Sequence, residues 1–215
     1  MFVGHYSASI VAKAVSPKTP LWLLLVAAQL VDIFWTSFVL LGIEKVRLDF
    51  SLLSNPLDLY FMPFTHSLAA TFFWAVIAYV LVRLIPRLNL TVKQSFIIAA
   101  VVASHWLLDL IVHRHDLLVF DDIKVGLGLW NYPIIALIVE VMLVAASVIF
   151  LCTKSSFSYL YKRRVIVFAL VLVILQISSM FRAIPNTVSL LVMTSFSIYI
   201  GIAIVGYFMD RKVKF

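Results

Sequence analysis

The sequence is poor in charge, cysteine and glycine, and each shortage excludes a class of protein. Only 13% of its 215 residues are charged and 64% are hydrophobic, with a mean hydropathy of +1.10. A soluble domain carries about 45–50% apolar and about 25% charged residues, so a water-soluble fold is excluded. The single cysteine, Cys152, excludes an intrachain disulfide and a CxxC metal site. No basic region precedes the first apolar run, so we expect no cleavable signal peptide.

Long apolar segments are present instead. A spanning helix needs roughly 20 apolar residues, and prolines such as Pro20, Pro63 and Pro86 separate the runs. With six glycines, no Gly-rich linker and no internal repeat, the chain reads as one domain over 1–215. We expect an all-α polytopic membrane protein with six transmembrane helices, at 21–43, 64–86, 94–112, 129–152, 164–182 and 186–209.

The basic residues are distributed unevenly between the connections. Twelve of the 17 Lys and Arg residues fall in the N-terminus, the 83–93 turn, the 153–164 loop and the C-terminus, and five in the other three connections. The positive-inside rule therefore predicts that both termini are cytoplasmic. The net charge of +7 is then a topology signal rather than a sign of nucleic-acid binding.

Five acids and histidines lie within or at the ends of the predicted spans. Such residues are costly in a bilayer, which makes each a functional candidate; they are Asp32, His66, His105, Asp109 and Glu140. In the third span the positions 105, 109 and 113 are four apart, so His105, Asp109 and His113 share one helix face, with Asp116 nearly in line. His115, Asp121 and Asp122 are expected in a solvated loop.

A short helix is also expected over residues 4–15, before the first span. If residues 16–20 form a turn, this helix folds back along the first span as a re-entrant helix, and His5 faces Asp32 about 20 Å from the turn. The alternative is an amphipathic helix on the membrane surface.

Imidazoles and carboxylates on several helices suit a divalent metal. They are the ligands that zinc takes in the absence of cysteine, and a catalytic site keeps one position open for water. Glu140 would then serve as a general base and Arg114 would neutralise a phosphate. The alternative is that these polar groups only hydrogen-bond between helices.

The same residues carry a family resemblance. Gly4-His5, Asp32, Thr65-His66-Ser67 and His105-Trp106-Leu107-Leu108-Asp109 resemble the LexA-binding, inner-membrane-bound metal-dependent hydrolase family of bacteria. The later residues His113, Arg114, Asp116, Trp130, Asn131 and Glu140 resemble a subgroup, so the resemblance covers roughly 4–140. The family pattern has a second acid two residues after Asp32 and His-Arg before Thr65, where this chain has Phe34 and Pro63-Phe64. These differences favour one metal.

The resemblance implies a hydrolase of the bacterial inner membrane that acts on a lipid or lipid-linked ester or phosphoester at the outer side. His66, His105 and Asp109 would bind zinc or manganese, completed by Asp32 and His5. Glu140 would be the base, and His113, Arg114 and Asp116 would line the mouth. The last two spans would be scaffold or a surface for a homo-oligomer. Two other functions fit the residues: a small cation- or proton-coupled transporter, and a non-catalytic membrane scaffold.

Overall fold

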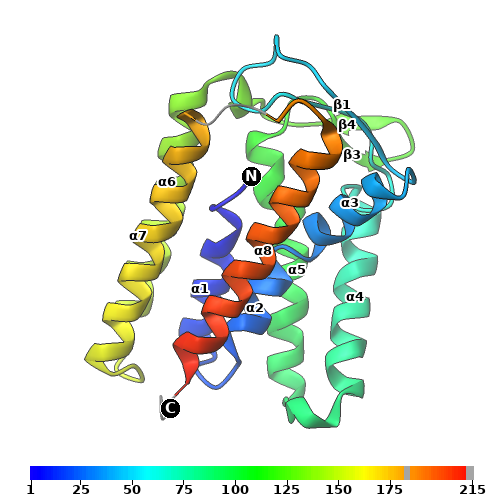
Figure 1. Ribbon diagram of the computed structural model, residues 1–215. Coiled ribbons are helices and arrows are strands. Elements are labelled where there is room, and N and C mark those ends of the chain that lie inside the picture. The colour runs from blue at the N-terminus through cyan, green and yellow to red at the C-terminus, as the bar shows by residue number, and fades with distance from the viewer. Residues whose placement is uncertain (182–184, 212–215) are drawn as a thin grey trace.

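The computed structural model describes residues 1–181 and 185–211, and most of them are helical (Figure 1). Two short β-hairpins lie at one end of the helices, and the turn between the first two helices lies at the other end (Figure 1). The elements are α1 (His5–Val15), α2 (Leu21–Ala28), α3 (Leu30–Leu40), β1 (Lys45–Leu48), β2 (Leu57–Phe61), α4 (Leu68–Leu84), α5 (Val92–Val112), β3 (Leu117–Phe120), β4 (Ile123–Val125), α6 (Pro133–Cys152), α7 (Tyr159–Phe181) and α8 (Val188–Asp210), with 3-10 turns at Pro86–Leu88 and Leu129–Asn131.

Four of the helices, α5 to α8, are long and apolar enough to cross a membrane. The predicted first span, 21–43, is divided into α2 and α3, which bend by 53° and raise the number to five if they form one span. The predicted second span, 64–86, is a helix of 17 residues, α4. The all-α membrane class is therefore supported, while the structure accounts for four or five of the six expected spans.

Local sequence signals set where the long helices begin. The Ser67 side chain accepts a hydrogen bond from the Ala70 amide at the start of α4. Thr91 and Gln94 form a capping box at the start of α5, and Pro133 occupies the first turn of α6. Ser67, Thr91 and Gln94 bond amides that have no partner within the helix, and Pro133 has no amide N–H to leave unpaired.

The N-terminal helix α1 lies inside the bundle. It packs against α2, α5 and α6, and the hydroxyl of Ser9 donates a hydrogen bond to the Leu24 carbonyl at 2.8 Å. The turn that joins α1 to α2 is closed by Ser16 and Thr19, whose hydroxyls lie 2.7 Å apart. Residues 4–15 were predicted to fold back along the next helix, and α1 does pack against α2.

The break between α2 and α3 is centred on Gln29. Its amide bonds to the Val26 carbonyl, three residues back, instead of continuing the α-helical pattern, and its side chain donates to the Phe2 carbonyl at 3.2 Å. Irregular backbone at membrane depth is tolerated where protein covers it; Gln29 is buried. The break also leaves the Ala28 carbonyl beside α5.

The loop that contains Gly126 and Gly128 packs against the C-terminal end of α5. The amides of Leu127 and Gly128 donate to the carbonyls of Leu110 and His113, at 2.8 and 2.7 Å. Gly126 has a φ of +153°, and a Cβ there would collide with the backbone of residue 114. Only glycine allows this close approach, so the loop fixes the position of His113.

Two apolar clusters divide the interior. On α5, Ile98 and Val102 belong to the larger cluster and Val112 to the smaller one under the hairpins. His105 and Asp109 lie between them on the same helix. His105 and Asp109 therefore lie at one level of the bundle, nearer to the hairpin end.

A second buried polar group lies at the opposite end, where α1, α2 and α8 meet. The Lys13 ammonium donates to Asp210 at 3.0 Å and to the Thr19 carbonyl at 2.9 Å. Asp210 also accepts from the Leu21 amide at 2.6 Å and from the Tyr161 hydroxyl at 2.9 Å. The Asp210 carboxylate of α8 thus links α1, α2 and α7 at this end of the bundle.

Candidate metal centre

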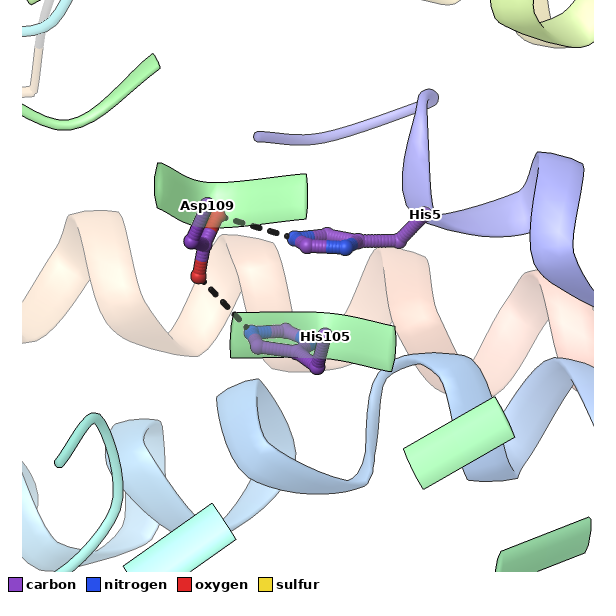
Figure 2. Close-up of side chains that lie close together, drawn as sticks. All are labelled: His5, His105 and Asp109. Atoms are coloured by element: carbon purple, nitrogen blue, oxygen red, sulfur yellow. Dashed lines mark hydrogen bonds and ion pairs between the residues drawn. The ribbon is translucent and has the colours of Figure 1, made fainter. Parts of the chain in front are cut away.

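The carboxylate of Asp109 lies beside two stacked imidazole rings and contacts the edge of each (Figure 2). The rings of His5 and His105 are nearly parallel, 9° apart, with centroids separated by 3.8 Å. Asp109 Oδ1 lies 3.1 Å from His5 Nε2, and Oδ2 lies 3.1 Å from His105 Nε2. All three side chains are about 1% exposed. The prediction paired His5 with Asp32, whereas its close polar contact is with Asp109.

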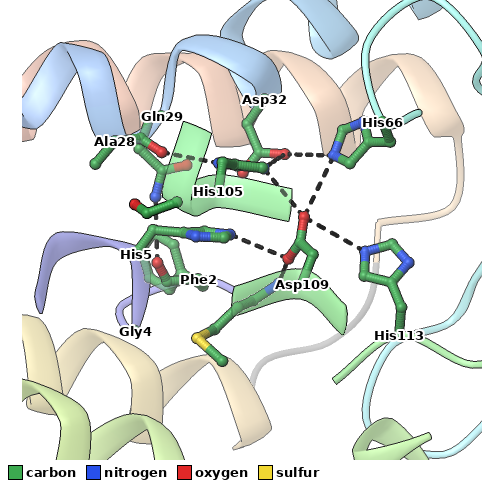
Figure 3. A network of polar contacts seen from close by, with 12 residues as sticks. Phe2, Gly4, His5, Ala28, Gln29, Asp32, His66, His105, Asp109 and His113 are labelled. Atoms are coloured by element: carbon green, nitrogen blue, oxygen red, sulfur yellow. Dashed lines mark hydrogen bonds and ion pairs between the residues drawn. The ribbon is translucent and has the colours of Figure 1, made fainter. Parts of the chain in front are cut away.

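A second carboxylate, that of Asp32 on α3, completes the cluster (Figure 3). Asp32 Oδ1 lies 3.2 Å from His66 Nε2 and 3.7 Å from His105 Nε2. His66 Nε2 is also 3.7 Å from Asp109 Oδ2. Two sets of candidate ligand atoms, His5–His105–Asp109 and Asp32–His66–His105, each lie within 4.8 Å of one another. The five residues predicted as metal ligands are therefore brought together.

The Nδ1 atoms of the two central histidines are held by oxygen atoms. His105 Nδ1 donates to the Ala28 carbonyl at 2.8 Å, at the break between α2 and α3. The Thr65 hydroxyl donates to Glu44 Oε2 at 2.6 Å, so its oxygen accepts from His66 Nδ1 at 2.8 Å. An Nδ1–H bond of this kind leaves Nε2 with a lone pair and fixes the ring orientation.

Glu44 is itself fixed by the backbone. Its Oε1 accepts from the amides of Phe64 and Thr65, at 2.8 and 2.9 Å. Burial raises the pKa of the Glu44 carboxyl, and the hydrogen bonds from Thr65 oppose this rise. The motif Thr65-His66-Ser67 is therefore a unit: Thr65 orients His66, and Ser67 begins α4.

With both imidazoles neutral, this arrangement places acceptors opposite acceptors. The Nε2 lone pairs of His66 and His105 face carboxylate oxygens of Asp32 and Asp109 at 3.2 and 3.1 Å. Within the described residues, His105 Nε2 and His5 Nδ1 are buried without a hydrogen bond of acceptable geometry. Two buried carboxylates require positive charge nearby. Nitrogen and oxygen donors around one point fit a divalent cation.

His113 extends the cluster towards the hairpin end. Its Nε2 lies 3.7 Å from Asp109 Oδ2, while Nδ1 lies 2.9 Å from Asp116 Oδ1. Its ring packs against Trp130 with centroids 4.3 Å apart. The prediction placed His113 and Asp116 at the mouth of the site. The structure puts His113 at the edge of the ligand set, with Asp116 behind it.

Glu140 contacts the N-terminal segment. Its Oε2 accepts from the amides of Phe2 and Gly4, both at 3.0 Å, and Gln176 donates to Oε1 at 3.4 Å. These amides precede the first turn of α1, where a carboxylate is favourable. The amino group of Met1 is 2.6 Å from Asp109 Oδ1. Glu140 thus holds α1, and with it His5, beside the cluster.

Arg114, predicted to neutralise a phosphate, is held in the outer loops. Its guanidinium donates to the carbonyls of Leu53 and Asn55, at 2.7 and 3.2 Å, and to Asn131 Oδ1 at 3.0 Å. These bonds join the β1–β2 loop to the segment before α6. Arg114 does not line the cavity described next, and His115 is exposed in the loop as expected.

A cavity of about 550 Å³ adjoins the cluster, a volume typical of small-molecule sites. Asp32, His66, Asp109, His113 and Glu140 form its polar wall. The β1–β2 loop, α6, α7 and α8 form the rest, through residues that include Asn55, Leu137, Gln176, Met180, Ser195, Ile198 and Tyr199.

Sequence analysis did not identify several residues of this site. Glu44 and Thr65 hold His66, and their signal was a single acid after the first span and a threonine beside a histidine. Gln176 and Tyr199 line the cavity from α7 and α8, where no site residue was predicted because these helices carry no acid or imidazole within their apolar runs.

The comparisons add no identification. No protein-family model matches the chain, and no curated protein and no solved structure matches it.

Proposed function

We propose that the protein is a membrane-embedded metal-dependent hydrolase that acts on a lipid or lipid-linked ester or phosphoester at the outer side of the membrane. The observation that carries the proposal is the convergence of three imidazoles and two carboxylates, from α1, α3, α5 and the segment before α4, in one cluster whose Asp32, His66 and Asp109 line a cavity. The proposed location is the bacterial inner membrane, which rests on the resemblance of Gly4-His5, Thr65-His66-Ser67 and His105…Asp109 to the family named above.

His66, His105 and Asp109 would hold the metal, with Asp32 and His5 completing the donor set. Zinc accepts this mixture of nitrogen and oxygen donors, and manganese is the second candidate. A divalent metal supplies Lewis-acid chemistry at such a site, polarising a substrate oxygen and lowering the pKa of water. His113, which lines the cavity with Nε2 towards Asp109, is placed to exchange a proton with a substrate there.

The one-sided shape of the cavity favours catalysis over transport. The cavity extends from the cluster to Asn55 in the β1–β2 loop. In the other direction α5 continues into buried Val102 and Ile98, which pack with Leu24 of α2. A one-sided pocket suits a substrate that enters and leaves by the same side. In this proposal α1 is a re-entrant helix, covered by protein on the side of α2, α5 and α6.

The first test is the metal content of detergent-purified protein, measured by inductively coupled plasma mass spectrometry. Wild type should carry about one zinc or manganese per chain, as expected for a single donor set. His105→Ala and Asp109→Ala should lose it. His115→Ala is the matched control, because His115 is exposed in the outer loop, and it should keep the metal.

Absence of stoichiometric metal, after growth with added divalent ions and purification without chelator, would overturn the proposal. So would equal metal content in wild type, His105→Ala and Asp109→Ala. If the metal is present, hydrolysis of lipid phosphoesters and esters by wild type, abolished in the same two variants, tests the chemistry.

A cation- or proton-coupled transporter is the second candidate. The break at Gln29, which lies beside the cluster through the bond from His105 to Ala28, is the observation that favours it, since transporters place substrate sites at broken helices. Flux measured in liposomes distinguishes the two: ion- or proton-coupled flux without hydrolysis would replace the first candidate by the second.

A further inference from the structure

The cavity has two kinds of wall. The polar wall carries Asp32, His66, Asp109 and Glu140, and a second wall, which belongs to α7 and α8, meets it where Gln176 donates to Glu140. The side chains of that wall include Met180, Leu191 and Ile198. Leu137 of α6 lines the cavity beside them. The cavity is therefore amphipathic, with its ionisable groups gathered on one side.

The hydroxyl groups on the α7–α8 wall are already bonded. Ser179 Oγ donates to the Gln176 carbonyl at 2.7 Å, and Ser195 Oγ donates to the Leu191 carbonyl at 3.1 Å. Thr194 Oγ1 donates to the Leu190 carbonyl at 2.7 Å. Because these donors are satisfied within their own helices, this wall is less polar than the first, and Gln176 and Tyr199 are its remaining polar side chains.

The two helices of this wall pack on different parts of the bundle. α7 packs against α6, whereas α8 packs against α2 and α3. In Figure 1, α7 and α8 lie on either side of the N-terminal residues, and Met1 and Phe2 line the same cavity. In a membrane-spanning chain both helices also face the bilayer, with outward residues such as Leu170 and Ile204 more than half exposed.

We infer that the cavity takes a phospholipid of the surrounding bilayer, with one acyl chain between the α6–α7 pair and α8 and the ester- or phosphate-bearing head group at the Asp32–His66–Asp109 wall. The inference rests on the proposed function, whose substrate class it narrows. The division of the cavity into a charged wall and an apolar wall matches the two parts of such a lipid. A chain that enters sideways between α7 and α8 avoids the unfavourable transfer of its methylene groups through water.

The test is photo-crosslinking in nanodiscs of phosphatidylethanolamine and phosphatidylglycerol. A phosphatidylethanolamine with a diazirine in one acyl chain is added as the probe, and cross-linked peptides are located by mass spectrometry. Wild type should cross-link at cavity-lining positions of 176–180 and 191–199 as well as at outward-facing residues.

Two substitutions on α8 form a matched pair. Ser195 lines the cavity, while Ser197 is exposed and bonds to the Met193 carbonyl in the same way. Ser195→Trp fills the cavity and should abolish the cavity cross-links while leaving the outward ones, and Ser197→Trp should preserve both. Thermal unfolding in detergent checks that both variants are folded.

Cross-links confined to outward-facing residues would overturn the inference. Cavity cross-links that survive Ser195→Trp, or that are lost equally in Ser197→Trp, would overturn it as well. The outcome is separable from the proposed function. Cavity cross-links in a protein that holds no metal would support the lipid in the cavity and contradict the proposed hydrolase. Metal-dependent hydrolysis without cavity cross-links would support the hydrolase and contradict the lipid in the cavity.

Discussion

At the residue scale, the orientation of the His66 ring depends on Glu44, which acts on the ring through Thr65. Glu44 Oε2 accepts the Thr65 hydroxyl proton, and this leaves the Thr65 oxygen to accept from His66 Nδ1. The bond determines which ring nitrogen carries the lone pair, and that nitrogen, Nε2, faces Asp32. Glu44 therefore acts as a positioning residue for a group that it does not touch.

Glu44→Gln reverses this chain of bonds and provides a test. The glutamine amide would donate to Thr65, whose hydroxyl would then donate to His66 Nδ1 and move the ring proton to Nε2. Loss of such a supporting bond typically lowers metal affinity by about 10–100-fold, and we expect that range in a competition titration with a chelating dye. Asp49→Asn is the control because Asp49 is an exposed acid on the same hairpin, and it should leave the affinity unchanged. Unchanged affinity in Glu44→Gln would remove the positioning role.

The individual candidate ligands were easier to predict from the sequence than the residues that each of them contacts. His105 and Asp109 are one helical turn apart in an apolar run, so their shared face follows from α-helical geometry alone. The pairing of His5 with Asp109 instead of Asp32 could not be predicted, because the bend at Gln29 sets the direction of α3 and no proline or glycine marks it. Thr65 contacts His66 and Glu44 contacts Thr65, and both are brought there by hairpin and loop backbone, whose course has no periodic signal.

At the element scale, α1, α2 and α8 are joined by the buried pair Lys13–Asp210. Lys13 is fully buried, and Asp210 also accepts the Leu21 amide at the start of α2. This end of the molecule contains none of the candidate metal ligands, so its contribution is to hold α1 in place and thereby to hold His5.

Removing one partner of this pair should destabilise the protein strongly. Breaking a fully buried pair costs about 3–5 kcal/mol. Because Asp210 is 16% exposed and keeps its bonds from Leu21 and Tyr161, Lys13→Met should lower the free energy of unfolding by less than that but by more than the about 1 kcal/mol of an exposed pair, measured by denaturant unfolding in detergent. Lys13→Met with Asp210→Asn should recover part of the loss, because no unpaired charge remains. Arg47→Ala, which breaks the exposed pair with Asp58, should cost less than about 1 kcal/mol. Equal losses for Lys13→Met and Arg47→Ala would contradict this account.

The boundaries of the long helices were predictable from hydropathy and capping residues. The expected spans 94–112 and 129–152 correspond to α5 (Val92–Val112) and α6 (Pro133–Cys152). The expected span 164–182 reaches residue 182, which lies outside the described part of the chain. The two β-hairpins were expected only as loops, because strands of three to five residues carry too little pattern to separate them from irregular connections.

At the scale of the whole molecule, the two ends of the bundle differ in charge and in content. The cluster and the cavity lie towards the hairpins, whereas the α4–α5 and α6–α7 turns lie together at the other end (Figure 1). Those two turns and their flanks include Arg83, Arg87, Lys154 and Lys162. Basic residues resist transfer across the membrane, so the hairpin end, and with it the mouth of the cavity, should be on the outer side.

Cysteine labelling tests this orientation with little background, because Cys152 is the only native cysteine. In a Cys152→Ser protein, Asp122→Cys places a thiol on the exposed β3–β4 turn and Ser156→Cys places one on the exposed α6–α7 turn. An impermeant maleimide should label Asp122→Cys in intact spheroplasts and Ser156→Cys only after lysis. The reverse pattern would put the cavity on the cytoplasmic side. Its phospholipid would then come from the inner leaflet, and the charge asymmetry of the loops would need another cause.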